Sequence, residues 1–210
     1  QGSVGMIGII DYGMGNLHSV YNALNHLGLE AVISDDAAIL ETCDQLILPG
    51  VGAFGDMMDC LESKGLDQWL IHPAKEVKKP RLGICLGMQA LFESSSENGL
   101  SKGLGLLQGK VIRMSDPGIR IPEIGWNELI VADDHPLKSR LSARPFAYYD
   151  HSYYASEWNP SDLAAYSCYG QSVIPGFVPK GNIAGAQFHP EKSSKDGLRI
   201  LEWFGKEFAS

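Results

Sequence analysis

A cysteine between two glycines is the strongest chemical signal in this chain. Residues 83–87 are Gly-Ile-Cys-Leu-Gly, and they join an apolar run to a helix-forming stretch at 88–93. This pattern predicts a nucleophile elbow, in which the glycines remove side chains that would collide in a tight strand-to-helix turn. The helix N-terminus would favour a thiolate at Cys85. The alternative, taken in isolation, is a small buried core residue.

A histidine and a glutamate far downstream fit such a nucleophile. His189 and Glu191 lie in the segment Gln-Phe-His-Pro-Glu at 187–191. Residues two apart project to the same side of an extended segment, and Pro190 disfavours helix at His189. A thiol needs an imidazole to take and return its proton, and the imidazole needs a carboxylate to fix its tautomer. We therefore expect a Cys-His-Glu triad. A surface histidine beside a solvated glutamate is the alternative for the pair alone.

A third segment predicts an oxyanion site. The apolar residues 46–48 lead into Pro49-Gly50-Val51-Gly52, a loop that can present backbone N–H groups to a developing negative charge. We expect the N–H groups of Gly50, Val51, Gly52 and Leu86 to serve this purpose. The loop lacks the glycine patterns typical of phosphate sites. A valine resists the positive φ that glycine accepts, so reorienting a peptide here would need outside help.

The elements around these segments alternate between strand and helix. We expect strands at 4–10, 31–33, 45–48 and 82–84, a helix capped by Asn16 and ending at Gly28, and a largely helical stretch at 57–77 interrupted near Gly65. This alternation predicts a central, mostly parallel sheet with helices on both faces. Both the glycine loop and the elbow then lie at the carboxyl ends of strands.

The C-terminal half has a different pattern, in which strands are joined by short turns. The expected strands span 104–114, 128–131, 146–154, 164–169, 172–178 and 183–188. They predict antiparallel additions that return His189 to the elbow. Ser193 or Ser194 would cap a last helix, whose expected buried stripe is Leu198, Leu201, Phe204 and Phe208.

Composition limits the class of protein. The chain has 210 residues, 44% of them hydrophobic, which suits one compact domain over residues 4–210, with Gln1-Gly2-Ser3 as a cleavage scar. No apolar run is long enough to predict a transmembrane helix. Widely spaced cysteines without a C-x-x-C pair predict a reducing cytoplasm and no metal or disulfide. A net charge of −8 argues against nonspecific nucleic-acid binding.

The order and spacing of PGVG, GICLGMQ and FHPEKSS resemble the class I glutamine amidotransferases. Residues 11–17 (DYGMGNL), 122–127 (P-x-x-GWN) and 151–154 (HSYY) resemble more closely the glutaminase subunit of imidazole glycerol phosphate synthase. In that subfamily a larger residue stands between the loop glycines, where most relatives have a double glycine. The resemblance runs from about residue 6 to the C-terminus and implies a flavodoxin-like fold without a cofactor.

The resemblance also implies a reaction. Cys85 would attack the side-chain amide carbon of glutamine, and His189, oriented by Glu191, would protonate the departing ammonia and then activate water. Gln89 lies one helical turn after Cys85 and is a candidate to bind the substrate. The family adds glutamine contacts at Gly52, Glu97, Ser152 and Tyr153. A helix-surface position for Gln89 and a solvated position for Glu97 are the alternatives.

The implied partner is a cyclase subunit, a separate (β/α)8 barrel that forms a heterodimer with this chain. It would use the ammonia to make imidazole glycerol phosphate and aminoimidazole carboxamide ribotide in histidine biosynthesis. The family places Asn16, Trp126, Tyr148 and Lys192 at the interface, although Asn16 could be only a helix cap, Trp126 a core residue and Lys192 a solvated lysine. Glu123 and Ile124 stand where the family commonly has His-Met. We expect Glu123 to alter the charge of that interface.

Three other functions are open from the sequence. A paralogue could feed ammonia to a different acceptor, such as a sugar amidotransferase. A cysteine hydrolase of related fold usually has histidine directly after its nucleophile, where this chain has Leu86. A flavodoxin-type binding module would need an anion at Gly13-Met14-Gly15-Asn16, before the first helix.

Overall fold

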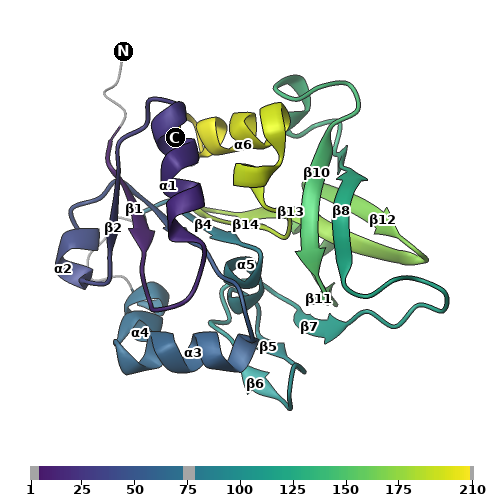
Figure 1. Cartoon of the computed structure of the whole chain (residues 1–210), viewed down its shortest axis with the longest axis horizontal. Helices are drawn as coiled ribbons and strands as arrows, with labels where there is room; N and C mark the ends of the chain where they lie inside the picture. The colour runs from purple at the N-terminus through teal and green to yellow at the C-terminus, as the bar shows by residue number, and fades with distance from the viewer. Residues whose placement is uncertain (1–4, 73–78, 209–210) are drawn as a thin grey trace.

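The computed structural model describes residues 5–72 and 79–208, and most of its strands belong to one sheet. These strands are β1 (Ile7–Ile10), β2 (Ala31–Ser34), β3 (Gln45–Leu48), β4 (Arg81–Ile84), β9 (Ile130–Val131), β12 (Ala165–Tyr169), β13 (Ser172–Lys180) and β14 (Ile183–Ala186). Within the described residues they form an eight-stranded sheet in the order β2-β1-β3-β4-β14-β13-β12-β9 (Figure 1).

The sheet has a parallel part and an antiparallel part. β2, β1, β3, β4 and β14 run parallel to one another, whereas β13, β12 and β9 continue the sheet through antiparallel pairings that begin between β14 and β13. The predicted mostly parallel sheet with antiparallel additions is confirmed. β14 belongs to both parts, because it pairs antiparallel with β13, as expected, and in parallel with β4, which was not expected.

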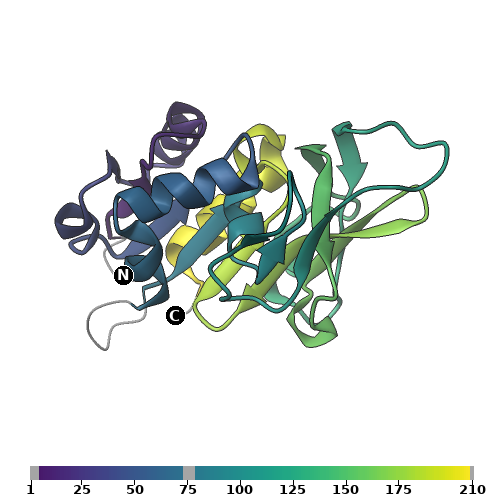
Figure 2. The ribbon, with the colours of Figure 1, turned by 90° about the horizontal axis from the view of Figure 1, so that it is seen from below.

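Helices cover both faces of this sheet. They are α1 (Leu17–His26), α2 (Ala37–Leu40), α3 (Phe54–Ser63), α4 (Leu66–Ile71), α5 (Leu86–Ala90) and α6 (Ser194–Lys206). Figures 1 and 2 show α1 and α6 on one face and α3, α4 and α5 on the other. Among the described residues, none of the helices has the length and apolar character needed to cross a membrane.

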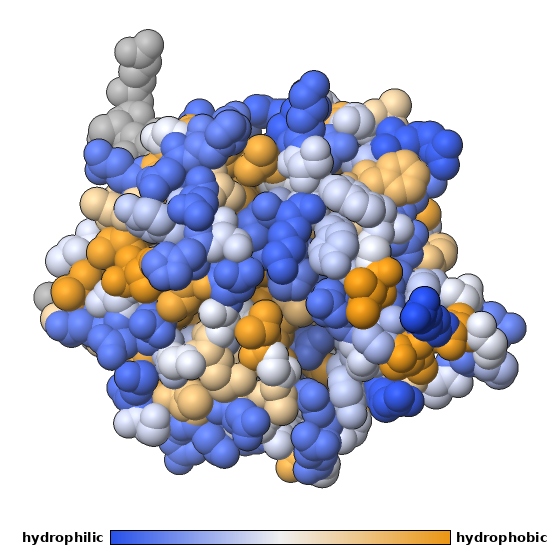
Figure 3. Space-filling view, in the orientation of Figure 1, coloured by the Kyte–Doolittle hydropathy of each residue, from blue (hydrophilic) through white to orange (hydrophobic). Residues whose placement is uncertain are grey.

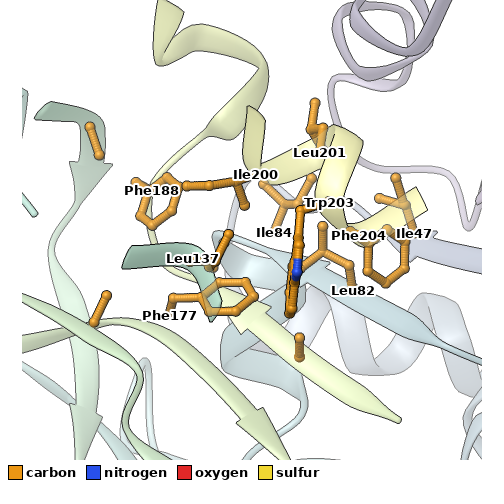
Figure 4. Close-up of a cluster of buried hydrophobic side chains, with 14 of the residues drawn as sticks. Ile47, Leu82, Ile84, Leu137, Phe177, Phe188, Ile200, Leu201, Trp203 and Phe204 are labelled. Atoms are coloured by element: carbon orange, nitrogen blue, oxygen red, sulfur yellow. The ribbon is translucent and has the colours of Figure 1, made fainter. Parts of the chain in front are cut away.

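Alternating strand residues build a separate core on each face of the sheet. Ile47, Leu82 and Ile84 pack toward α6, where Leu201 and Phe204 complete the cluster (Figure 4). Their neighbours in the strands belong to the other core, which α3, α4 and α5 cover; this second core includes Ile10, Leu46, Leu48, Phe54, Met57, Leu61 and Leu86. Period-two alternation therefore gives the central strands two buried faces.

Shorter strands extend beyond the main sheet. β11 (Tyr153–Ser156), β7 (Lys110–Arg113), β5 (Ser94–Ser95) and β6 (Ser101–Lys102) form a second small sheet. β8 (Glu123–Glu128) and β10 (Phe146–His151) form an antiparallel ribbon, in which Glu123 faces His151 and Trp126 faces Tyr148. Alternation turns Trp126 and Phe146 to the outside, where 54% and 42% of their surfaces are exposed. Elsewhere the exterior mixes polar and apolar patches (Figure 3).

Several predicted boundaries are wrong. The helical stretch expected at 57–77 begins earlier, at Phe54, and its residues 73–77 lie outside the described part. Its predicted interruption near Gly65 is confirmed, because Gly65, at a φ of 68°, separates α3 from α4. The strand expected at 104–114 shortens to β7, and the one expected at 128–131 divides between β8 and β9. Residues 1–4, which include the predicted cleavage scar, are also outside the described part.

The predicted helix caps are confirmed in position but not in their hydrogen bonds. Asn16 precedes α1 and Ser193 precedes α6, but neither side chain makes a capping hydrogen bond. The Ser193 hydroxyl instead donates to the backbone oxygen of His189 at 2.6 Å and accepts from the backbone N–H of Tyr148 at 2.9 Å. Ser193 therefore ties the segment that carries His189 to the ribbon. In the last helix, Leu201, Phe204 and Phe208 are buried as predicted, and Leu198 is partly buried.

Two glycines allow α5 to lie directly against the sheet. A Cβ on Gly87 would lie 1.8 Å from the backbone oxygen of Leu48, and a Cβ on Gly83 would lie 2.5 Å from the backbone oxygen of Gly87. Real Cβ atoms do not approach backbone atoms this closely. The elbow glycines are therefore required by the contact between helix and strands.

We predict that Gly87→Ala lowers the free energy of unfolding by about 3 kcal/mol or more, because the new methyl group forces β3 and α5 apart. Urea denaturation measures the change. Gly55→Ala is the matched control, since its Cβ would lie 3.4 Å from the Ser101 hydroxyl and no closer to any other atom. In helix α3, Ala should be neutral or stabilising by up to about 1 kcal/mol. Equal stability of the two variants would contradict the prediction.

Candidate active site

The parallel pairing of β4 with β14 brings the distant candidate residues together. Ala186 is the register partner of Ile84, and the backbone N–H of Cys85 donates to the oxygen of Ala186 at 2.7 Å. Both strands end at this edge of the sheet, where β4 leads into the elbow and β14 leads toward His189. Parallel strands end at the same edge of a sheet, so a separation of about a hundred residues in sequence becomes a contact.

Cys85 occupies a strained backbone conformation at the start of α5. Its φ is 55° and its ψ is −112°, in a region that residues with a Cβ rarely adopt. The residue is 7% exposed. The sulfur lies 3.7 Å from the backbone oxygen of Asp150 and 3.8 Å from Nε2 of Gln187. This geometry is that of the predicted elbow.

His189 is held between Cys85 and Glu191. Its Nδ1 lies 2.8 Å from Oε1 of Glu191, and the two side chains are 5% and 1% exposed. Because a carboxylate accepts, Nδ1 carries a proton and Nε2 is left for Cys85. Burial disfavours the charged imidazole, but hydrogen bonds to Cys85 and Glu191 outweigh it and raise the pKa of His189 to about 10. The site therefore favours a protonated imidazole beside the sulfur.

The glycine loop lies against the elbow. The hydroxyl of Tyr12 donates to the backbone oxygen of Pro49 at 2.7 Å, and burial raises the pKa of Tyr12 well above its ordinary value. A Cβ on Gly50 would lie 2.7 Å from the backbone nitrogen of Gly87, so only glycine fits there. Val51 is 43% exposed and Gly52 has a φ of 101°. The N–H groups of this loop as oxyanion donors remain a prediction.

These elements surround a cavity of about 300 Å³. Its lining includes Val51, Gly52, Cys85, Leu86, Gln89, Glu97, Pro122, Asp150, His151, Ser152, Tyr153, His189 and Lys192. Every predicted catalytic, oxyanion or glutamine-binding residue is in this set except Gly50 and Glu191. No role was predicted from the sequence for Pro122, Asp150 or His151. Pro122 and His151 lay within motif segments that could have indicated them, whereas Asp150 had no signal.

The side chains of two candidates for binding glutamine, Gln89 and Glu97, are held by hydrogen bonds to other parts of the protein. Gln89 is 4% exposed, so the helix-surface alternative is wrong. Its Nε2 donates to the backbone oxygen of Tyr153 at 3.0 Å and to Oε1 of Gln187 at 3.1 Å. Glu97 accepts at Oε2 from the backbone N–H of Phe54 at 3.0 Å, which satisfies one donor at the start of α3.

Of the predicted interface residues, Lys192 lines the cavity, and the others differ in how far they are exposed. Trp126 is 54% exposed, so the alternative of a core position is wrong. Its ring meets that of Tyr148 edge to face, with centroids 6.0 Å apart. Lys192 is exposed and also lines the cavity. Asn16 is half-buried just before α1.

The expectation for Glu123 is wrong. Its side chain is 5% exposed and lies 2.8 Å from Nε2 of His151, so it adds no charge to the outer face of the ribbon. Strand alternation explains this, because Glu123 points inward while its neighbour Ile124 is 63% exposed.

Comparison with known proteins agrees with this geometry. A family model described as glutamine amidotransferase class-I matches residues 8–208. The chain belongs to that family. It is 49% identical to imidazole glycerol phosphate synthase subunit HisH of Symbiobacterium thermophilum, over 94% of this chain and 92% of that protein. The HisH subunit of Bacillus subtilis is 48% identical, over 96% of each chain.

Solved structures at lower identity share the fold. A glutamine amidotransferase crystal structure matches with a TM-score of 0.73 at 21% identity, over 94% of this chain and 96% of that one. PurLQS from Thermotoga maritima matches with a TM-score of 0.66 at 20% identity, over 95% of this chain and 96% of that one. Within the described residues, no group of three or more His, Cys, Asp or Glu is arranged to hold a metal ion.

We predict that Glu191→Gln makes stability less dependent on pH. The raised pKa of His189 contributes stability that is fully present below pH 6.5 and is lost as pH rises through about 10. Without the carboxylate, the folded-state pKa falls toward its ordinary value, so the free energy of unfolding should decline less between pH 6.5 and 10 than in the wild type. Urea denaturation at both pH values measures this. Glu62→Gln, an exposed change in α3, is the control, and an unaltered pH dependence in Glu191→Gln would contradict the assignment.

Proposed function

We propose that this protein hydrolyses glutamine as the amidotransferase subunit of an imidazole glycerol phosphate synthase in histidine biosynthesis. The observation that carries the proposal is the meeting of Cys85 with the His189–Glu191 pair at one cavity. Identities of 48% and 49% to HisH subunits over nearly the whole chain support the same function. The sugar amidotransferase alternative is not favoured, because these relatives are subunits of imidazole glycerol phosphate synthase.

The reaction follows from the positions of the two side chains. The sulfur of Cys85 bonds to the side-chain amide carbon of glutamine, and the carbonyl oxygen takes the negative charge. Backbone N–H groups of Leu86 and the 50–52 loop would hold that oxygen. Protonated His189 gives its proton to the amide nitrogen as the C–N bond breaks, so ammonia leaves. His189 then removes a proton from water, which attacks the thioester and releases glutamate.

The hydrogen bonds of Gln89 define how it would meet the substrate. Both protons of its Nε2 are directed to oxygens of Tyr153 and Gln187, so its own Oε1 is the group left to accept from glutamine. Glu97 uses Oε2 at α3, which leaves Oε1 for the α-ammonium. Ser152 and Tyr153, which also line the cavity, would bind the amino-acid backbone.

The partner we propose is a (β/α)8 cyclase that forms a heterodimer with this chain in the cytoplasm. Ammonia attacks only in its neutral form, so it must pass to the second site without equilibrating with water. The exposed Trp126 and the nearby Tyr148 lie on the ribbon, and Lys192 lies at the cavity, so a partner covering them would close the site. The cyclase would then make imidazole glycerol phosphate and aminoimidazole carboxamide ribotide.

The function is tested by measuring glutamate release from glutamine, first with this protein alone and then with a cyclase subunit and its nucleotide ligand. We expect the complex with ligand to hydrolyse glutamine at least about 10²-fold faster than this protein alone. This is the effect on the rate of placing one additional N–H donor at the oxyanion. Cys85→Ala should abolish the stimulated rate. High activity without partner would indicate a free-standing glutaminase, and no activity in the complex would refute the proposal.

We predict that Trp126→Ala weakens the complex with the cyclase by about 30-fold or more in Kd, as expected for a large aromatic residue at the centre of an interface. Isothermal titration calorimetry measures the affinity. Val173→Ala is the matched control, because Val173 is also an exposed apolar strand residue, 41% exposed, but lies on β13. If both variants bind like the wild type, the ribbon is not the docking surface.

A further inference from the structure

The structure contains a second buried histidine–glutamate pair that the reaction above does not use. Nε2 of His151 lies 2.8 Å from Oε1 of Glu123, and the side chains are 2% and 5% exposed. The two residues face each other across the β8–β10 ribbon. His151 also lines the cavity that contains Cys85. A buried pair of ionisable groups beside a nucleophile calls for a physical account.

The contacts of His151 fix the proton on one of its two ring nitrogens. Nδ1 of His151 lies 2.8 Å from the backbone oxygen of Tyr153, which can only accept, so Nδ1 must donate. Nε2 is then the nitrogen that faces Glu123. The other carboxyl oxygen, Oε2, accepts from Nδ2 of Asn127 at 2.9 Å. Glu123 thus holds the imidazole in the orientation in which it donates to Tyr153.

The same Tyr153 oxygen sets the direction of a chain of amides. It also accepts from Nε2 of Gln89 at 3.0 Å, so that amide must present its nitrogen to Tyr153. The second proton of this nitrogen faces Oε1 of Gln187 at 3.1 Å. Gln187 must therefore present its own nitrogen on the other side, where Nε2 lies 3.8 Å from the sulfur of Cys85. The N–H group of Gln187 therefore faces the sulfur of Cys85 because the first member of this series of hydrogen bonds, the backbone oxygen of Tyr153, can only accept.

We propose that Glu123 and His151 are a positioning pair that, through Tyr153, Gln89 and Gln187, keeps an N–H donor directed at the sulfur of Cys85. This inference rests on the proposed function for its catalytic meaning. The backbone oxygen of Asp150 lies 3.7 Å from the same sulfur and favours the neutral thiol. The Gln187 donor acts against that oxygen and favours the thiolate. Reversing either amide would place an oxygen at the sulfur instead.

The test measures Cys85 itself, so it does not depend on glutamine hydrolysis. The full-length protein is alkylated with iodoacetamide from pH 5 to 10, and mass spectrometry follows the Cys85 peptide separately from those of Cys43, Cys60 and Cys168. The variants are His151→Phe, Gln187→Met, their double variant, Glu123→Leu and Glu123→Gln. His189, Glu191 and Tyr12, which interact with Cys85 or its imidazole, are unchanged in all of them. So are the other ionisable residues that line the cavity with Cys85, namely Glu97, Asp150 and Lys192.

We expect His151→Phe and Gln187→Met each to slow alkylation of Cys85 about tenfold at pH 7, the effect of one hydrogen bond to a charged group, and to move the pH midpoint upward. The double variant should be no slower than the single ones, since both break the same chain. Glu123→Gln should recover most of the rate that Glu123→Leu loses, because its amide can donate to His151 and accept from Asn127.

Unchanged midpoints in His151→Phe and Gln187→Met, or effects that add in the double variant, would overturn the proposal. If His151→Phe does not fold, Gln187→Met and the two Glu123 variants still decide it. A change in thermal stability with an unaltered alkylation profile would show a purely structural pair and also overturn it. Failure of the glutaminase assay, by contrast, would refute the proposed function and leave the alkylation result interpretable.

Discussion

The parallel pairing of β4 with β14 is the constraint on which the site depends. It aligns Ile84 with Ala186, so that Cys85 and His189 leave the sheet at one edge. An antiparallel β14 would carry His189 to the opposite edge, out of reach of the sulfur. The two hydrophobic cores exist on either face of these same strands, and the elbow glycines let α5 lie close enough to complete one of them. The same strand pairing and helix contact therefore build the hydrophobic cores and bring the site residues together.

Buried ionisable groups at this edge are stable only as pairs. Removing a charge from water is costly unless a partner and further hydrogen bonds compensate. His189 has Glu191, and His151 has Glu123, each at 2.8 Å. The first pair lies beside the sulfur of Cys85, whereas the second lies on the ribbon whose outer face carries Trp126 and Tyr148. The inner face of the ribbon thus carries the buried Glu123–His151 pair, and its outer face carries Trp126 and Tyr148.

Much of the fold and of the cavity could be predicted because local rules decide them. The alternation of strand and helix patterns predicted a mostly parallel sheet with helices on both faces, and the glycines on either side of Cys85 predicted the elbow. The buried Glu123 could not be predicted, because its position depends on the register between β8 and β10, which no local pattern encodes. The parallel pairing of β14 with β4 could not be predicted for a related reason. These two strands are far apart in the sequence, and only β13, the strand next to β14 in the sequence, suggested a direction for it. Ser193 looked like a helix cap, but tertiary contacts with His189 and Tyr148 use its hydroxyl.

The most direct test of the central claim is to trap the covalent intermediate. The complex with cyclase and nucleotide ligand is mixed with glutamine, quenched in acid within milliseconds and analysed by peptide mass spectrometry. Our account predicts the added mass of one glutamyl group on the Cys85 peptide, and none in a Cys85→Ser sample treated in the same way. A glutamyl group on another cysteine, or rapid glutamate release with an unmodified Cys85 at every quench time, would contradict it.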